Sequence, residues 1–276
     1  MMRVIAAPPL TRREWLGRLV RTPKGTLLLV LLLLAAITAP AAGSGSAWRA
    51  LGIAAAVAVA LDLLLARLRG WGWVLPDGAL ISGLLVGMVL SPDVAWWIPA
   101  AMSALAIAAK HALRIRRGHV FNPAALALAL AALLQLGLQS WWGALARPQW
   151  LVVALLVATG LLVADRVNRF AMVGAFLGTY FGLLAFVALW IDPDLVREAY
   201  RPPFVNAALF FAFFMLDDPP TSPGRPTAQK RYGSIVAVAS VAAFLLPHQL
   251  AFLPLGVLAG NLWYAVYRLR SSRAAR

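Results

Sequence analysis

Residues 76–92 have the sequence PDGALISGLLVGMVLSP, an apolar segment that begins and ends at a proline. The stretch from Ala79 to Leu90 would form only about 18 Å of helix, whereas the hydrocarbon core of a bilayer is about 30 Å thick. Residues 203–219, PFVNAALFFAFFMLDDP, form a second segment of this kind, 127 residues further along the chain. The two segments predict short or broken helices at equivalent positions of a membrane protein.

The composition around these segments is that of a chain in lipid. Of the 276 residues, 62% are hydrophobic and 13% are charged, whereas soluble domains are about half apolar and a quarter charged. Because backbone groups in lipid must be satisfied within the segment, we expect an all-α integral membrane fold with about ten transmembrane helices. The apolar runs cover residues 25–42, 48–66, 73–90, 94–113, 120–137, 149–164, 170–191, 203–216, 233–247 and 250–267.

The basic residues predict the orientation of the helices. The net charge is +15, and the Lys and Arg residues fall between apolar runs, which favours membrane orientation over nucleic-acid binding. We therefore expect a bacterial-type cytoplasmic membrane, with a basic tail at 1–24 and another at 269–276, both cytoplasmic. All of the 25 Lys and Arg residues lie in these tails and alternate connections, except Arg49, Arg147, Arg197 and Arg201.

The chain also contains an internal repeat. Besides the proline-bracketed segments, Phe121-Asn122-Pro123 has an echo in Phe252-Leu253-Pro254. Five helices in each half, at 25–138 and 149–268, would place the two halves upside down relative to each other. In such inverted repeats the functional site usually lies between the short or broken segments.

Two helix starts supply candidate site residues. Asp77 can cap the segment that carries Ser82, and Gly83 and Gly87 have the spacing that lets helices approach closely. Asn122 and Pro123 suit the cap and first turn of the next helix but one. Capping and packing alone would also explain these residues, while the functional interpretation is that Asn122 presents an amide to a ligand or ion.

An acidic turn is the most distinctive motif. Residues 213–227, FFMLDDPPTSPGRPT, place two carboxylates at the end of an apolar segment, before a stiff turn with hydroxyl groups and an arginine. Acidic residues at a membrane boundary usually have a partner or a role. The alternative is that the two acids lie at the membrane interface and only balance the charge of nearby basic residues. The candidates are Asp217, Asp218, Thr221, Ser222 and Arg225, with Asn206 nearer the middle of its segment.

Several kinds of chemistry are not expected. The chain has no cysteine, so it cannot hold a cysteine-ligated iron–sulfur cluster. His111 and His119 lie on one predicted side and His248 on the other, so we expect no haem and no other metal site. Motifs of soluble hydrolases, phosphate loops and dinucleotide folds are missing, so the sequence leaves open whether the chain is an enzyme.

Residues 121–124, FNPA, and 214–223, FMLDDPPTSP, resemble motifs of the D subunit of the Rnf electron-transport complex and the B subunit of the sodium-pumping NADH:quinone oxidoreductase (RnfD and NqrB). The resemblance implies a ten-span membrane subunit that takes part in electron transport, in contact with other membrane or flavoprotein redox subunits, with ion translocation as a possible coupled step. It also implies that the candidate residues hold a flavin, FMN or riboflavin, or a quinone.

The resemblance departs from the family at the covalent flavin site. The family attaches a flavin through phosphate to a threonine in a short Gly-Ala motif, but this chain has Leu145 after Gly143-Ala144. Leucine has no hydroxyl group, so we expect no covalent FMN there and a noncovalent flavin at most, with Trp141 or Trp142 able to stack on its ring.

Two other functions stay open on the sequence. Inverted five-span repeats are a common plan of transporters and channels for small solutes or ions, so the same fold could serve without redox chemistry. The chain could also be a non-catalytic membrane partner of a separate redox protein.

Overall fold

The computed structural model describes residue 17 and residues 21–71, 75–115, 118–136, 139–144, 150–246 and 251–274. Most of these residues are helical, which confirms the all-α class. The helices are α2 (Pro23–Thr38), α3 (Ser44–Leu68), α4 (Asp77–Val89), α5 (Trp97–Ala112), α6 (Pro123–Leu133), α7 (Trp150–Val167), α8 (Phe170–Trp190), α9 (Phe204–Phe214), α10 (Pro226–Phe244) and α11 (Phe252–Ala274). Short 3-10 turns are η1 (Trp142–Ala144), η2 (Pro193–Leu195) and η3 (Arg197–Tyr200).

Each helix corresponds to one of the apolar runs of the sequence. The main difference is a two-stranded antiparallel hairpin, β1 (Arg114–Ile115) and β2 (Gly118–His119), which the hydropathy pattern did not predict. His248 and Leu145 lie outside the described residues, as do most of the N-terminal tail and the last two residues of the C-terminal tail.

The short helices have local causes in the sequence. The side chain of Asn122 caps α6, because its Oδ1 accepts a hydrogen bond from the backbone N–H of Ala125 at 3.0 Å, and Pro123 occupies the first turn. Helices α4, α6 and α9 have 13, 11 and 11 residues. At 1.5 Å per residue none of them spans about 30 Å of hydrocarbon alone, as the bracketing prolines predicted.

Helix α4 packs closely on α3 through its two glycines. A Cβ atom added to Gly83 would lie 2.7 Å from the carbonyl oxygen of Ala54, and one added to Gly87 would lie 3.0 Å from Cα of Leu51. The backbones can approach this far only because neither position carries a side chain. Packing therefore accounts for these glycines.

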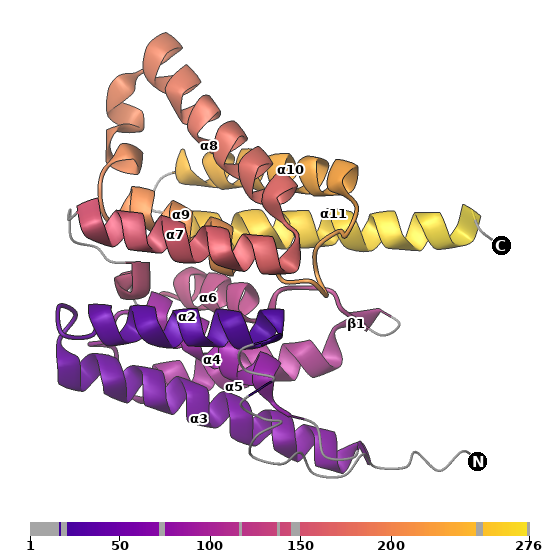
Figure 1. Ribbon diagram of the computed structural model, residues 1–276. Coiled ribbons are helices and arrows are strands. Elements are labelled where there is room, and N and C mark those ends of the chain that lie inside the picture. The colour runs from indigo at the N-terminus through magenta and orange to yellow at the C-terminus, as the bar shows by residue number, and fades with distance from the viewer. Residues whose placement is uncertain are drawn as a thin grey trace.

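The helices form two groups that follow each other in the chain (Figure 1). Helices α2 to α6 lie together in one group and α7 to α11 in the other, and α2 packs against α7 where the groups meet. Helix α6 packs against α11 across the same boundary. The start of α2 and the end of α11 lie at the same end of the molecule.

The outer surface is that of a membrane protein. Helices α3 and α8 are long and apolar enough to cross a membrane by themselves, whereas α2, α4, α6 and α9 are apolar but shorter. The described residues contain ten helices, of which two pass this test of length and composition, so the number of membrane spans stays a prediction. Large apolar side chains are exposed along the outer helices, including Leu32 and Leu33 of α2, Leu64 of α3, Leu161 and Leu162 of α7, and Phe186 and Leu189 of α8.

Candidate functional site

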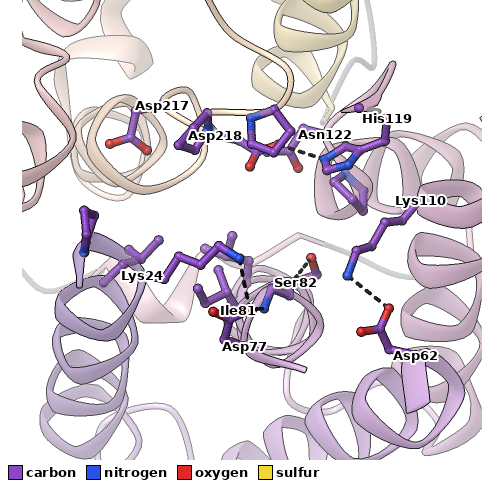
Figure 2. Close-up of a pocket in the computed structure, with 18 of the residues that line it drawn as sticks. Lys24, Asp62, Asp77, Ile81, Ser82, Lys110, His119, Asn122, Asp217 and Asp218 are labelled. Carbon is purple, nitrogen blue, oxygen red and sulfur yellow. Dashed lines mark hydrogen bonds and ion pairs between the residues drawn. The ribbon is translucent and has the colours of Figure 1, made fainter. Parts of the chain in front are cut away.

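A pocket of about 340 Å³ lies where the two groups of helices meet. Its walls come from the starts of α2, α4 and α6, the ends of α3, α5 and α9, and the β1–β2 hairpin. Figure 2 shows Asp217 and Asp218 on the opposite side of the cavity from Lys24 and Asp77. The volume lies in the range of small-molecule sites, which is about 300–1,000 Å³. The polar lining residues are Lys24, Asp62, Asp77, Ser82, Lys110, His111, Arg114, His119, Asn122, Asp217 and Asp218.

One wall is built around the start of α4. The Nζ of Lys24 lies 3.0 Å from Oδ1 of Asp77, and the same oxygen accepts a hydrogen bond from the backbone N–H of Gly78 at 2.6 Å. The hydroxyl of Ser82 donates to the carbonyl oxygen of Gly78 at 2.9 Å. Asp77 therefore accepts a hydrogen bond from one of the free backbone N–H groups at the start of α4. The same carboxylate also forms an ion pair with Lys24 of α2.

A second wall joins the ends of α3 and α5 through a buried acid. Oδ1 of Asp62 lies 3.0 Å from Nζ of Lys110 and 2.8 Å from Nε2 of His111. Arg69 donates to the carbonyl oxygen of His111 at 3.1 Å, and its Nη1 lies 3.2 Å from the ring Nδ1. Because an arginine can only donate, Nδ1 must accept, and Nε2 then carries the proton that Asp62 accepts. This cluster fixes the histidine as a neutral donor.

The two sequence motifs are hydrogen-bonded to each other. Nδ2 of Asn122 donates to the carbonyl oxygen of Met215 at 3.0 Å, which joins the start of α6 to the turn after α9. The backbone N–H of Asn122 donates to Oδ1 of Asn261 at 2.8 Å. In turn Asn261 donates to the carbonyl oxygen of Thr221 at 3.2 Å and lies 2.6 Å from the hydroxyl of Tyr232. Helices α6, α10 and α11 therefore hold the acidic turn in place.

Asp218 connects the turn to the opposite group of helices. Its Oδ2 lies 3.1 Å from Nε2 of His119 in the hairpin and accepts a hydrogen bond from the hydroxyl of Thr221 at 2.9 Å. Its carbonyl oxygen accepts from the hydroxyl of Ser222 at 2.8 Å. Thr221 and Ser222 thus act behind the pocket wall, where they shape the turn that carries the carboxylate.

Asp217 is in a different environment. It lies three residues after the end of α9 and is 3% exposed, and its Oδ2 has no hydrogen-bond partner among the described residues. Burial away from water and the neighbouring charge of Asp218 raise the pKa of this carboxyl to about 8, with Arg169 acting in the opposite direction. The Nη1 of Arg169 donates to the carbonyl oxygen of Pro223 at 2.6 Å.

The predicted site residues fall into two sets. Asp77, Ser82, Asn122, Pro123, Asp217 and Asp218 meet at the pocket, with Thr221 and Ser222 directly behind it. Asn206 is fully buried in α9 and does not line the pocket, so its predicted role stays a prediction. Arg225 is exposed at the start of α10, and no ion pair joins it to either acid within the described part of the chain. The predicted role of Arg225 in the site therefore stays a prediction.

The pocket also contains residues that sequence reasoning did not select. In the sequence, Lys24 and Lys110 indicate only the orientation of the helices, and His119 is not expected to bind haem. Asp62 stands out in the sequence only as a polar residue within an apolar run. The available signal was the position of all four at segment ends that carry Lys and Arg, since these ends lie on one side of a bundle with alternating helices.

The loop expected to stack on a flavin is part of the core instead. Trp141 and Trp142 are buried, and Nε1 of Trp142 donates to the carbonyl oxygen of Gly87 at 2.8 Å. The ring of Trp141 lies edge-on to Phe210. This loop follows the end of α6, whereas the pocket lies at the start of that helix. Any flavin in the pocket is therefore contacted by other residues.

Comparison with known families agrees with the resemblance that the sequence motifs indicate. Residues 133–264 match the NQR2, RnfD, RnfE family. The matched region includes the acidic turn, α7 to α10 and the first part of α11, while the FNPA motif lies before it. A search of curated proteins found no match to this chain.

Proposed function

Because residues 133–264 match the NQR2, RnfD, RnfE family, we propose that this chain is an electron-transfer subunit of that type, which binds a noncovalent flavin in the pocket between its two groups of helices. A flavin supplies one- and two-electron chemistry when bound. The chain itself provides the enclosure, the hydrogen bonds and the charges around it.

One observation carries this proposal. The two motifs that resemble the RnfD and NqrB subunits lie far apart in the sequence, yet Asn122 donates directly to Met215 and both motifs line one cavity. Residues that only capped separate helices would not need to meet. Their meeting at a concave site of ligand size favours a shared role in binding.

The charges of the pocket favour a flavin without a phosphate. The ammonium groups of Lys24 and Lys110 lie near the start of α4, but each is already paired with a carboxylate, Asp77 or Asp62. Asp217 and Asp218 add two more acidic groups to the lining. A phosphate would face the carboxylate of Asp218, while both lysines of the lining are paired with carboxylates and Arg114 lies over the ring of Trp71. Riboflavin has no phosphate to be repelled in this way. The residues present therefore fit riboflavin better than FMN.

We expect any bound flavin to leave when the protein is denatured. A phosphoester bond needs a hydroxyl group, and Leu145 has none. The nearest hydroxyl in that loop belongs to Ser140, and its Oγ is buried. The protein would be purified with its flavin, run on a denaturing gel and viewed under ultraviolet light. A fluorescent band at the mass of the chain would contradict the proposal and would identify an unrecognised acceptor.

We also infer that the two groups of helices are inverted repeats, with α2 to α6 equivalent to α7 to α11. The packing supports this: α3 packs on α5 as α8 packs on α10, and α2 packs on α4 as α7 packs on α9. The pairs α2–α7 and α6–α11, which join equivalent helices, lie at the boundary. An odd number of helices per repeat makes the orientations opposite.

A transporter or channel is the second candidate, because a polar pocket between inverted repeats is the usual position of a transport site. Absorbance separates the two functions. If the purified protein shows no flavin spectrum and vesicles that contain it take up a small ion or solute, the transporter assignment replaces the electron-transfer one.

The orientation can be tested with reporter fusions. We propose that both termini and the connection from Asp217 to Tyr232 face the cytoplasm, because the basic residues gather on that side. A reporter fused after Arg117 should then report the cytoplasm, and one fused after Ala146 should report the opposite side. Fusions that report the same side would show that the number of spans between these positions is wrong.

A further inference from the structure

Asp217 is a buried carboxyl whose partner is missing. It is 3% exposed, its Oδ2 has no hydrogen-bond partner among the described residues, and it lines the pocket. The carboxyl accepts a hydrogen bond from the backbone N–H of Asp217 itself, but an ionised carboxylate here would lose its hydration with no donor for Oδ2, which is costly. The structure therefore requires an explanation for how this side chain is tolerated.

The surrounding charges do not supply the explanation. Asp218 follows directly and is held by His119 and Thr221, so it is the better placed of the two acids to be ionised. A second negative charge beside it would be repelled. The nearby cation, Arg169, forms no ion pair with Asp217 within the described residues and donates to a backbone oxygen instead.

The lysines across the pocket already form ion pairs with other carboxylates. The ammonium group of Lys24 is paired with Asp77, and that of Lys110 is paired with Asp62. His111 is fixed as a donor to Asp62, and Figure 2 shows Lys110 and His119 on the side of the cavity away from Asp217. Arg114, the remaining cation of the lining, lies over the ring of Trp71. Among the described residues, no lysine, arginine or histidine forms an ion pair with Asp217.

We propose that Asp217 carries a proton in the resting protein and offers its O–H group as a hydrogen-bond donor to a carbonyl oxygen of the ligand in the pocket. The choice of ligand rests on the proposed function, since a flavin ring presents such oxygens, but the protonated state rests on the pocket alone. Asp217 then selects a ligand that presents a hydrogen-bond acceptor and disfavours a metal cation.

Infrared spectroscopy of the purified full chain tests the proton directly. A protonated carboxyl gives a C=O stretching band that an ionised one lacks. We expect this band at pH 7, with a loss near pH 8 as the carboxyl ionises, in agreement with its raised pKa. Asp217→Asn, which preserves the shape, should remove the titrating band, and Asp93→Asn should keep it because Asp93 is exposed.

Stability gives a second measurement. Because the pKa of Asp217 is higher in the folded than in the unfolded protein, the folded state binds more protons between pH 4 and pH 8, and stability falls as the pH rises through this window. The melting temperature of Asp217→Asn should therefore exceed that of the wild type most at pH 8 and least near pH 4. An equal difference at every pH, or a titrating band that survives in Asp217→Asn, would overturn the proposal.

Two further outcomes separate the alternatives. If added Na⁺ shifts the midpoint of the band, the carboxyl is a cation ligand and the proposal is wrong. Riboflavin provides the ligand probe: its affinity should fall as the pH rises through 8 in the wild type and become independent of pH in Asp217→Asn, whose amide still donates. If riboflavin fails to bind while the band behaves as expected, the proposed flavin is wrong but the protonated carboxyl stands.

Discussion

Asp218→Ala should reduce electron transfer at least tenfold in membranes where the chain is assembled with its redox partners, without a comparable loss of inserted protein. The carboxylate accepts from Thr221 and pairs with His119, so its removal releases the turn from the hairpin on the opposite side of the pocket. Hydrogen bonds to charged groups contribute about 1.5–3 kcal/mol each, which corresponds to roughly ten- to a hundredfold.

Insertion responds differently to the same change. A charge removed from the end of a membrane segment costs little in insertion and can favour it. Asp93→Ala is the matched control, because Asp93 is an exposed acid in the connection after α4 and does not line the pocket. The amount of each variant in the membrane would be measured together with activity. If Asp218→Ala inserts normally and keeps full activity, the acidic turn has only a structural, capping role.

The sequence predicted the helices well because each helix contains one continuous apolar run. The short helices were also predictable, since the prolines and the capping residue Asn122 act locally. The β1–β2 hairpin was missed because its strands have two residues each and no alternating pattern can be read from so few. Helix number and length are therefore properties of local sequence in this protein.

The pocket was only partly predictable because its pairs are not local. Lys24 lies 53 residues from Asp77 and Lys110 lies 48 residues from Asp62, and no spacing rule connects them. Proximity in sequence suggested Arg225 as the partner of the acidic turn. The structure instead brings His119 to Asp218 from 99 residues away. A basic residue at a helix end indicates the orientation of the helix in either case, so its presence does not show whether it also pairs with an acid.

Gly83→Ala should destabilise the protein by about 1–3 kcal/mol, the usual cost of overpacking a close contact. The new Cβ would lie 2.7 Å from the carbonyl oxygen of Ala54 and 2.9 Å from Cα of Ala55. Both are backbone atoms of α3, which cannot rotate away as a side chain can. Helix α4 must therefore move, and since its first residues carry Asp77, the pocket wall should shift with it.

Gly52→Ala is the matched control for this prediction, because Gly52 lies within α3 and a Cβ there would meet nothing within 4 Å. Alanine is favoured over glycine in a helix interior by up to about 1 kcal/mol, and that gain applies to both variants. A lower melting temperature in detergent for Gly83→Ala alone therefore isolates the contact with α3. If both variants melt at or above the wild-type temperature, α3 and α4 do not pack as closely as described, and the position of Asp77 in the pocket loses its support.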